Sequence, residues 1–203
     1  MPEIKKKNMI LLGAGGRNSG KTLLASKLIE HYSHQHTIIA IKVTTIQKKD
    51  ETCPRGGKGC GVCSSLEGTY CITEEQDRAS KKDTSRLLAS GARKVFWLRA
   101  LKDHLIEGIE ALFEIIPEEV ALVCESNSLR TVIKPGVFLL VKDKNQSTLK
   151  PSAQKVQRFA DRIVEFDSKR PEDKPFDLDF KDIQLINNQW VIINKDFHIR
   201  CTH

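Results

Sequence analysis

The sequence lacks any long hydrophobic run. No apolar segment approaches the ~20 residues that a membrane-spanning helix needs. The N-terminal region, with Lys5, Lys6 and Lys7 directly before a predicted strand, also lacks the apolar core and the cleavage site of a signal peptide. We therefore expect a cytoplasmic protein that has no membrane partner.

Aromatic residues are also scarce, at 6% of the 203 residues, and the basic residues are scattered along the chain. A nucleic-acid interface usually combines a basic patch with aromatic side chains that stack on bases. We therefore do not expect a nucleic-acid partner, and we interpret the net charge of +7 as solvated surface together with a site for phosphate. The length and the mixed composition predict a single domain over residues 1–203.

A glycine-rich motif follows the first apolar stretch. Residues 15–22 match G-x-x-x-x-G-K-T, and they lie between a predicted strand at 9–12 and a predicted helix at 22–32. The glycines allow a tight turn with free backbone N–H groups, and the helix N-terminus adds partial positive charge. We predict a nucleoside triphosphate site formed by Gly15, Gly16, Arg17, Asn18, Ser19, Gly20, Lys21 and Thr22. Lys21 would reach the β- and γ-phosphates, and the Thr22 hydroxyl would hold Mg²⁺.

The base of this nucleotide stays open between guanine and adenine. No Asn-Lys-x-Asp motif, which would read guanine, is present, and Lys142-Asp143 is only a weak substitute. The prediction is therefore GTP or ATP.

Four of the six cysteines gather in residues 47–82, a stretch with almost no apolar periodicity. Cys53, Cys60, Cys63 and Cys71 are spaced C-x6-C-x2-C-x7-C, and Cys60 and Cys63 can place two thiolates on one metal. Cysteines of a cytoplasmic chain are metal ligands more often than disulfides. We predict an inserted metal-binding segment that holds either Zn²⁺ or an iron–sulfur cluster, since spacing does not decide between them. The alternative is four unrelated reduced cysteines in a mobile loop.

Apolar strand and helix patterns alternate along the rest of the chain, which predicts an α/β fold with a mainly parallel sheet flanked by helices. We expect regular structure to resume at Lys82 after the cysteine-rich segment, and a β-hairpin to form within a C-terminal extension at 176–203. The expected strands are 9–12, 38–43, 95–98, 120–124, 137–141 and 163–166, and the expected helices are 22–32, 83–90, 105–116 and 151–160.

Two acidic residues are candidates for the chemistry of the nucleotide site. Glu125 ends the apolar strand at 120–124, where nucleotide hydrolases keep an acidic residue that faces Mg²⁺ or orders the attacking water. It could instead only cap the turn that follows. Asp83 could lie near the same metal or serve simply as a helix N-cap. With Lys21, these residues form the predicted catalytic set.

These motifs resemble the MobB-type molybdopterin-guanine dinucleotide biosynthesis proteins, which are small P-loop GTP-binding proteins. The likeness rests on the motif at 15–22, on the segment from Lys82 to Ala92 and on the strand that ends in Glu125. It implies a P-loop NTPase fold and a role in molybdenum cofactor biosynthesis, with Asp83 and Glu125 near the metal and the γ-phosphate. The four-cysteine segment and the region after Lys150 depart from the family pattern.

The leading hypothesis is a nucleotide-switched accessory factor for the maturation of a metal cofactor or metalloenzyme, with slow GTP or ATP hydrolysis coupled to the cysteine segment. Its partner would be a client metalloenzyme or a cofactor-synthesis protein, and the sequence leaves a homodimer open. A second hypothesis is a small-molecule kinase in which Arg17, Lys42 and Arg86 stabilise the transferred phosphoryl group. A third is a zinc-stapled nucleotide-binding module without turnover.

Overall fold

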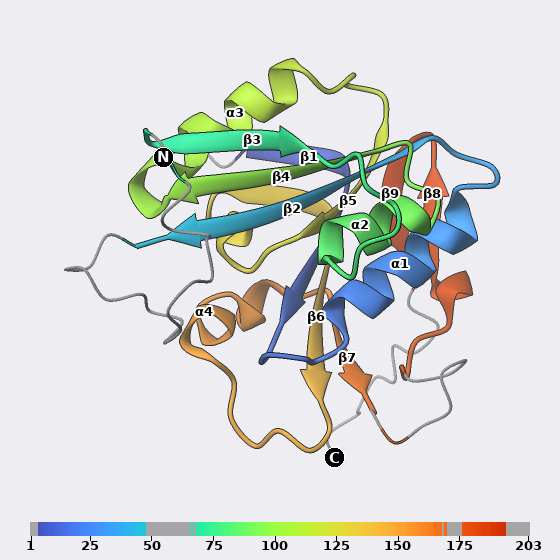
Figure 1. The fold of residues 1–203 in the computed structure, drawn as a ribbon. Helices are drawn as coiled ribbons and strands as arrows, with labels where there is room; N and C mark the ends of the chain where they lie inside the picture. Colours follow the sequence, from blue (N-terminus) through green and yellow to red (C-terminus); the bar gives the residue numbers. More distant parts are fainter. Residues whose placement is uncertain (1–3, 48–65, 67, 168, 170–175, 194–203) are drawn as a thin grey trace, which may run out of the picture.

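Seven strands form one sheet in the order β3-β4-β2-β5-β1-β6-β7 (Figure 1). The computed structural model describes residues 4–47, 66, 68–167, 169 and 176–193. Every strand pair of this sheet is parallel except β3–β4, which is antiparallel. The sheet strands are β1 (Ile4–Ala14), β2 (Ile38–Ile46), β3 (Tyr70–Glu74), β4 (Lys94–Leu101), β5 (Ala121–Glu125), β6 (Ile133–Asp143) and β7 (Arg162–Phe166).

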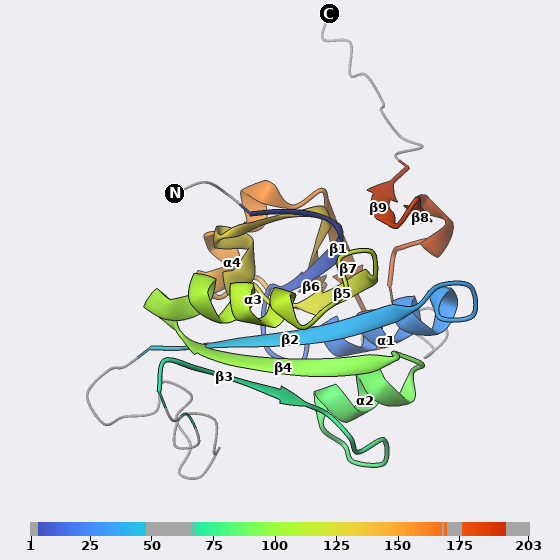
Figure 2. The same cartoon turned by 90° about the horizontal axis from the view of Figure 1, so that it is seen from above.

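Helices cover both faces of this sheet (Figure 2). The helices are α1 (Lys21–Tyr32), α2 (Asp83–Ala89), α3 (Leu105–Glu114) and α4 (Pro151–Gln154), with 3-10 turns η1 (Lys102–His104), η2 (Ser128–Thr131), η3 (Gln157–Phe159) and η4 (Phe180–Asp182). A separate antiparallel hairpin consists of β8 (Ile183–Ile186) and β9 (Gln189–Ile192). No helix in the described part of the chain is both long and apolar enough to span a membrane.

Alternating side chains of β1 supply both halves of the core. Ile10 and Leu12 face the side covered by α1, α2 and the hairpin, whereas Met9 and Leu11 face the side covered by α3 and α4. All four side chains are fully buried. A strand that is apolar on both faces is typical of the centre of a parallel sheet, and β1 accordingly pairs with β5 and β6.

The position of β1 also determines where a ligand would bind. The chain places β2, β4 and β5 on one side of β1 and then crosses to form β6 and β7 on the other side. In open parallel sheets, such a change of direction leaves a crevice at the carboxyl ends of the strands. The glycine-rich segment at 15–20 follows the carboxyl end of β1 and therefore lies at this position.

The α/β class, the mainly parallel sheet and the C-terminal hairpin predicted from the sequence are confirmed. The hairpin turns at Asn187 and Asn188, which both have positive φ, as a two-residue turn of this kind requires. The hairpin does not extend the main sheet but packs on it through Trp190, which is 1% exposed and contacts Tyr32 of α1 edge-on.

The expectation that regular structure resumes only at Lys82 was wrong. Residues 70–74 form β3, which pairs with β4 at the edge of the sheet. The side chains of this edge strand are half-buried or exposed, so the strand lacks the continuous apolar run that marks the central strands. Its sequence signal is therefore weak.

The predicted helix at 151–160 was also only partly correct. Regular α-helix ends at Gln154, and a 3-10 turn follows at Gln157–Phe159. Val156 is buried, but Phe159 is 38% exposed, and the guanidinium groups of Arg130 and Arg158 both lie close to its ring.

Candidate functional site

The glycine-rich loop joins β1 to α1 in a left-handed turn. Gly20 has a φ of 77° and directly precedes the first helical residue, Lys21, while its carbonyl accepts a hydrogen bond from the Leu24 backbone N–H. This φ is readily adopted only by glycine, which explains the residue at this position. The loop thus has the strand–loop–helix context that the sequence predicted, with Lys21 and Thr22 in the first turn of α1.

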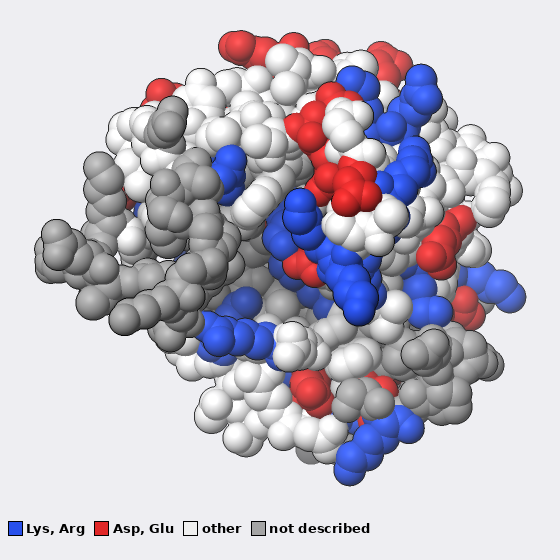
Figure 3. All heavy atoms as spheres, in the orientation of Figure 1, with Lys and Arg blue, Asp and Glu red and all other residues white. Residues whose placement is uncertain are grey.

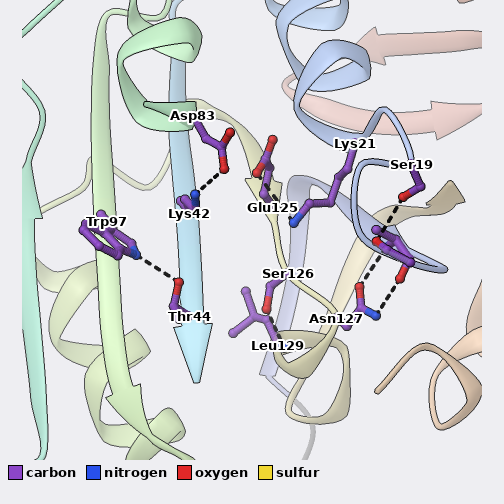
Figure 4. A network of polar contacts seen from close by, with 12 residues as sticks. Ser19, Lys21, Lys42, Thr44, Asp83, Trp97, Glu125, Ser126, Asn127 and Leu129 are labelled. Atoms are coloured by element: carbon purple, nitrogen blue, oxygen red, sulfur yellow. Dashed lines mark hydrogen bonds and ion pairs between the residues drawn. The ribbon is translucent and has the colours of Figure 1, made fainter. Parts of the chain in front are cut away.

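Asn127 holds the start of this loop. Its Oδ1 accepts a hydrogen bond from the Ala14 N–H at 2.7 Å, and its Nδ2 donates to the Ala14 carbonyl at 3.0 Å (Figure 4). The same Nδ2 donates to Ser152 Oγ at 3.2 Å. Asn127 is 7% exposed, so a buried amide links the loop to the segment after β5 and to α4.

The segment after β6 packs on the loop from the other side. The Lys150 N–H donates to the Gly15 carbonyl at 2.7 Å, and the Gly15 N–H donates to the Val141 carbonyl at 2.7 Å. The side chain of Gln146 lies so close to Gly16 that a Cβ at Gly16 would stand 2.2 Å from its Oε1. The loop is therefore held on both sides while Arg17 and Asn18 remain exposed.

Two predicted catalytic residues meet at the carboxyl end of the sheet. Lys21 Nζ lies 3.6 Å from Glu125 Oε2 (Figure 4). Glu125 is 1% exposed, and among the described residues neither of its carboxylate oxygens has a hydrogen-bond partner. A buried carboxylate without hydrogen bonds is costly unless another group satisfies it. The alternative that Glu125 caps the next turn fails, because it is Ser126 Oγ that accepts the Leu129 N–H.

Asp83 forms a second ion pair beside the first. Its carboxylate accepts a hydrogen bond from Lys42 Nζ, and Lys42 stands opposite Glu125 in the pairing of β2 with β5 (Figure 4). Burial by itself would raise the pKa of the Asp83 carboxyl. The hydrogen bond and charge of Lys42, with the charges of Lys21 and Arg86, outweigh burial and hold that pKa below its usual value. Asp83 is the first residue of α2 and makes no cap hydrogen bond, so the N-cap alternative is wrong.

Two cations and two carboxylates therefore share one site. Lys21 and Glu125 come from α1 and β5, and Lys42 and Asp83 come from β2 and α2. The unsatisfied oxygens of Glu125 suit a hydrated Mg²⁺ or a water molecule, both of which would supply the missing partners. Lys21 is free to exchange its contact with Glu125 for an anionic ligand at the glycine-rich loop, because its side chain is 23% exposed.

Comparisons with protein-family models, curated proteins and solved structures gave no match. The resemblance to MobB-type proteins therefore stays a prediction.

The cysteine-rich segment is described only at its C-terminal end. Cys53, Cys60 and Cys63 lie outside the described residues, whereas Cys71 lies in β3. Its Sγ accepts a hydrogen bond from Arg99 Nη2 at 3.1 Å. In the residues that the structure describes, no three His, Cys, Asp or Glu side chains are grouped to hold a metal. Cys124 is fully buried, as expected for a core residue, and this burial raises the pKa of its thiol.

The sequence did not predict that Asn127 holds the start of the glycine-rich loop or that the side chain of Gln146 packs against Gly16. Asn127 lies 113 residues from its partner Ala14, and nothing in a Ser-Asn-Ser turn signals such a contact.

Lys142-Asp143, the weak substitute for a guanine motif, ends β6 next to the loop. Asp143 Oδ1 there accepts from the Asn145 N–H at 2.9 Å.

Proposed function

We propose that the chain is a P-loop protein that binds a nucleoside triphosphate, GTP or ATP, with Mg²⁺ and hydrolyses it slowly. The observation that carries this proposal is the buried Glu125 carboxylate, which faces Lys21 beside the glycine-rich loop and has no hydrogen-bond partner among the described residues. An acidic group in this position fits a role in ordering Mg²⁺ or an attacking water, and a lysine in this position fits a role in binding phosphate.

The residues of the site divide into binding and chemical roles. Backbone N–H groups of 15–20 and the Lys21 ammonium would surround the phosphates, and Thr22 would hold Mg²⁺. Mg²⁺ supplies charge neutralisation at the β- and γ-phosphates when bound. Glu125 would accept a hydrogen bond from water, and Lys42 would keep Asp83 ionised next to this centre.

Calorimetric titration of the full chain with non-hydrolysable GTP and ATP analogues, with and without Mg²⁺, tests binding directly. We expect one site per chain, with affinity that falls when Mg²⁺ is removed. Product analysis with the hydrolysable nucleotides then separates the mechanisms: phosphate released to water supports a hydrolase, whereas diphosphate formed only with an added acceptor supports a kinase. Absence of heat with either analogue would refute the proposal.

We also propose, on the resemblance to MobB-type proteins, that the nucleotide site serves the maturation of a metal cofactor or metalloenzyme. In this proposal Cys71, with Cys53, Cys60 and Cys63, binds Zn²⁺ or an iron–sulfur cluster. The support comes from Gln47 and Thr69, described residues that lie before and after Cys53, Cys60 and Cys63 in the chain. Gln47 follows β2, and the Thr69 carbonyl accepts the Leu101 N–H at the end of β4, so both ends lie at the carboxyl edge of the sheet.

Metal and acid-labile sulfide analysis of protein purified without oxygen tests this cysteine site. We expect one zinc ion per chain, or iron with sulfide, and a loss of that metal when Cys60 and Cys63 are both replaced by serine. Nucleotide affinity should stay within about threefold, because the double replacement keeps the glycine-rich loop at 15–22, Asp83 and Glu125. Metal-free wild-type protein would contradict the proposal.

A further inference from the structure

A pocket of about 430 Å³ lies at the carboxyl edge of the sheet, apart from the glycine-rich loop. It is bordered by the end of β2, by η1 and the start of α3, by the segment after β5 and by α4. Its volume is within the ~300–1,000 Å³ of typical small-molecule sites. None of the predicted nucleotide residues lines it, so the proposed function leaves this pocket without a ligand.

The polar wall of the pocket offers hydrogen-bond donors in fixed positions. Ser152 Oγ accepts a hydrogen bond from Asn127 Nδ2 at 3.2 Å. The Thr45 and Ser128 hydroxyl oxygens lie 2.7 Å apart, so one of these two hydroxyls accepts from the other. Because an accepting hydroxyl keeps its own hydrogen, Ser152 and one member of the Thr45–Ser128 pair can each donate to a ligand.

The charge of the wall is positive. Lys102 and Lys155 both line the pocket, and no carboxylate of the described residues lies within 4.0 Å of either ammonium group. Among the described lining residues Asp103 is the acidic one, so two positive charges of this part of the chain face one negative charge. Figure 3 shows one face of the molecule, on which basic and acidic side chains both border a central hollow.

Part of the remaining wall is apolar. Leu105 is 3% exposed and Ile46 is 7% exposed, and Val132 lies beside them. A ligand that satisfies the whole pocket therefore carries an anionic group for the lysines and hydroxyls, and an apolar body for these side chains. We propose that the pocket binds a small organic anion, a carboxylate or phosphate ester with an apolar body, as a ligand separate from the nucleotide.

The probes that test this proposal are benzoate, phenyl phosphate and benzamide, the last being a neutral analogue of benzoate with nearly the same shape. They are titrated into the ¹⁵N-labelled full chain without nucleotide while backbone amide shifts are followed. We expect benzoate or phenyl phosphate to shift the amides of Thr44, Ser128 and Ser152, and benzamide to bind at least about tenfold more weakly.

Two double variants separate the pocket from general surface charge. Lys102→Gln with Lys155→Gln should weaken binding of the anionic probes about tenfold. Lys5→Gln with Lys134→Gln removes the same charge from exposed positions on β1 and β6, on the part of the sheet where those two strands begin, and should leave that binding unchanged. Thr45→Val, which keeps the shape and removes one hydroxyl of the wall, should weaken it several-fold.

Three results would overturn the proposal. The first is no shift in the wall amides with either anionic probe at about 10 mM, a concentration that nearly saturates a site with a millimolar dissociation constant. The second is equal binding of benzamide, and the third is equal weakening of binding by both double variants. Because the titrations contain no nucleotide, such a failure leaves the proposed nucleotide site untouched, and a chain that fails to bind nucleotide can still bind these probes.

Discussion

Replacing Lys21 with alanine lowers the affinity for nucleoside triphosphate by about 100-fold or more if the glycine-rich loop works as proposed. A charge-assisted hydrogen bond contributes about 1.5–3 kcal/mol, and Lys21 would make such bonds to two phosphates. Each 1.4 kcal/mol corresponds to a factor of about ten in the dissociation constant. Calorimetric titration of the variant with a non-hydrolysable triphosphate measures this loss.

The matched control is Lys27→Ala, which removes a lysine from the same helix, further from the loop. We expect its triphosphate affinity to stay within about twofold of wild type, because charges beyond a Debye length are screened at ordinary salt. Unchanged affinity in Lys21→Ala, or equal losses in both variants, would show that the loop does not bind phosphate through Lys21.

A second control separates lost binding from lost folding. Removing Lys21 leaves the buried Glu125 without its counter-charge, and breaking such a pair costs on the order of 3 kcal/mol of the free energy of unfolding. Lys21→Ala combined with Glu125→Gln removes this uncompensated charge. The double variant should recover much of the lost stability in urea denaturation while its triphosphate affinity remains low.

The fold was largely predictable because its central strands carry strong local signals. Each of β1, β2, β5 and β6 contains a buried apolar run, at 9–12, 38–41, 121–124 and 137–141 respectively. The hairpin turn could be located from Asn187-Asn188 alone, since asparagine tolerates positive φ. The edge strand β3 gave no such signal, and the position of Phe159 depends on arginine contacts that periodicity does not encode.

The candidate site was predictable in its members but not in its connections. The motif at 15–22 and the acidic end of β5 placed Lys21 and Glu125 near each other through a general property of parallel sheets. The pairing of Lys42 with Asp83 required the position of α2 relative to β2, and the Asn127 contacts required the exact packing of a turn against Ala14. The pocket beside α4 is formed by residues from four separate stretches of the chain, at 44–47, 102–105, 128–132 and 151–155, so no single stretch of the sequence predicts it.

Replacing Glu125 with glutamine should lower the rate of triphosphate hydrolysis about 100-fold or more while leaving triphosphate affinity within a few-fold of wild type. Glutamine has nearly the same shape and still accepts a hydrogen bond, but it cannot take a proton from water, and general-base groups contribute about 10²–10⁴-fold to rate. Single-turnover phosphate release measures the chemical step, and calorimetry with the non-hydrolysable analogue measures binding.

The matched control for this substitution is Glu114→Gln, which makes the same chemical change at an exposed position at the end of α3. It should hydrolyse triphosphate at the wild-type rate. A wild-type rate in Glu125→Gln would remove Glu125 from the chemistry and leave it only the role of holding Lys21 in the ligand-free protein. A joint loss of affinity and rate in Glu125→Gln would instead indicate that Glu125 helps to hold Mg²⁺, because nucleotide binding would then depend on its charge. Calorimetry without Mg²⁺ distinguishes this case, because wild type and Glu125→Gln should then bind the analogue equally.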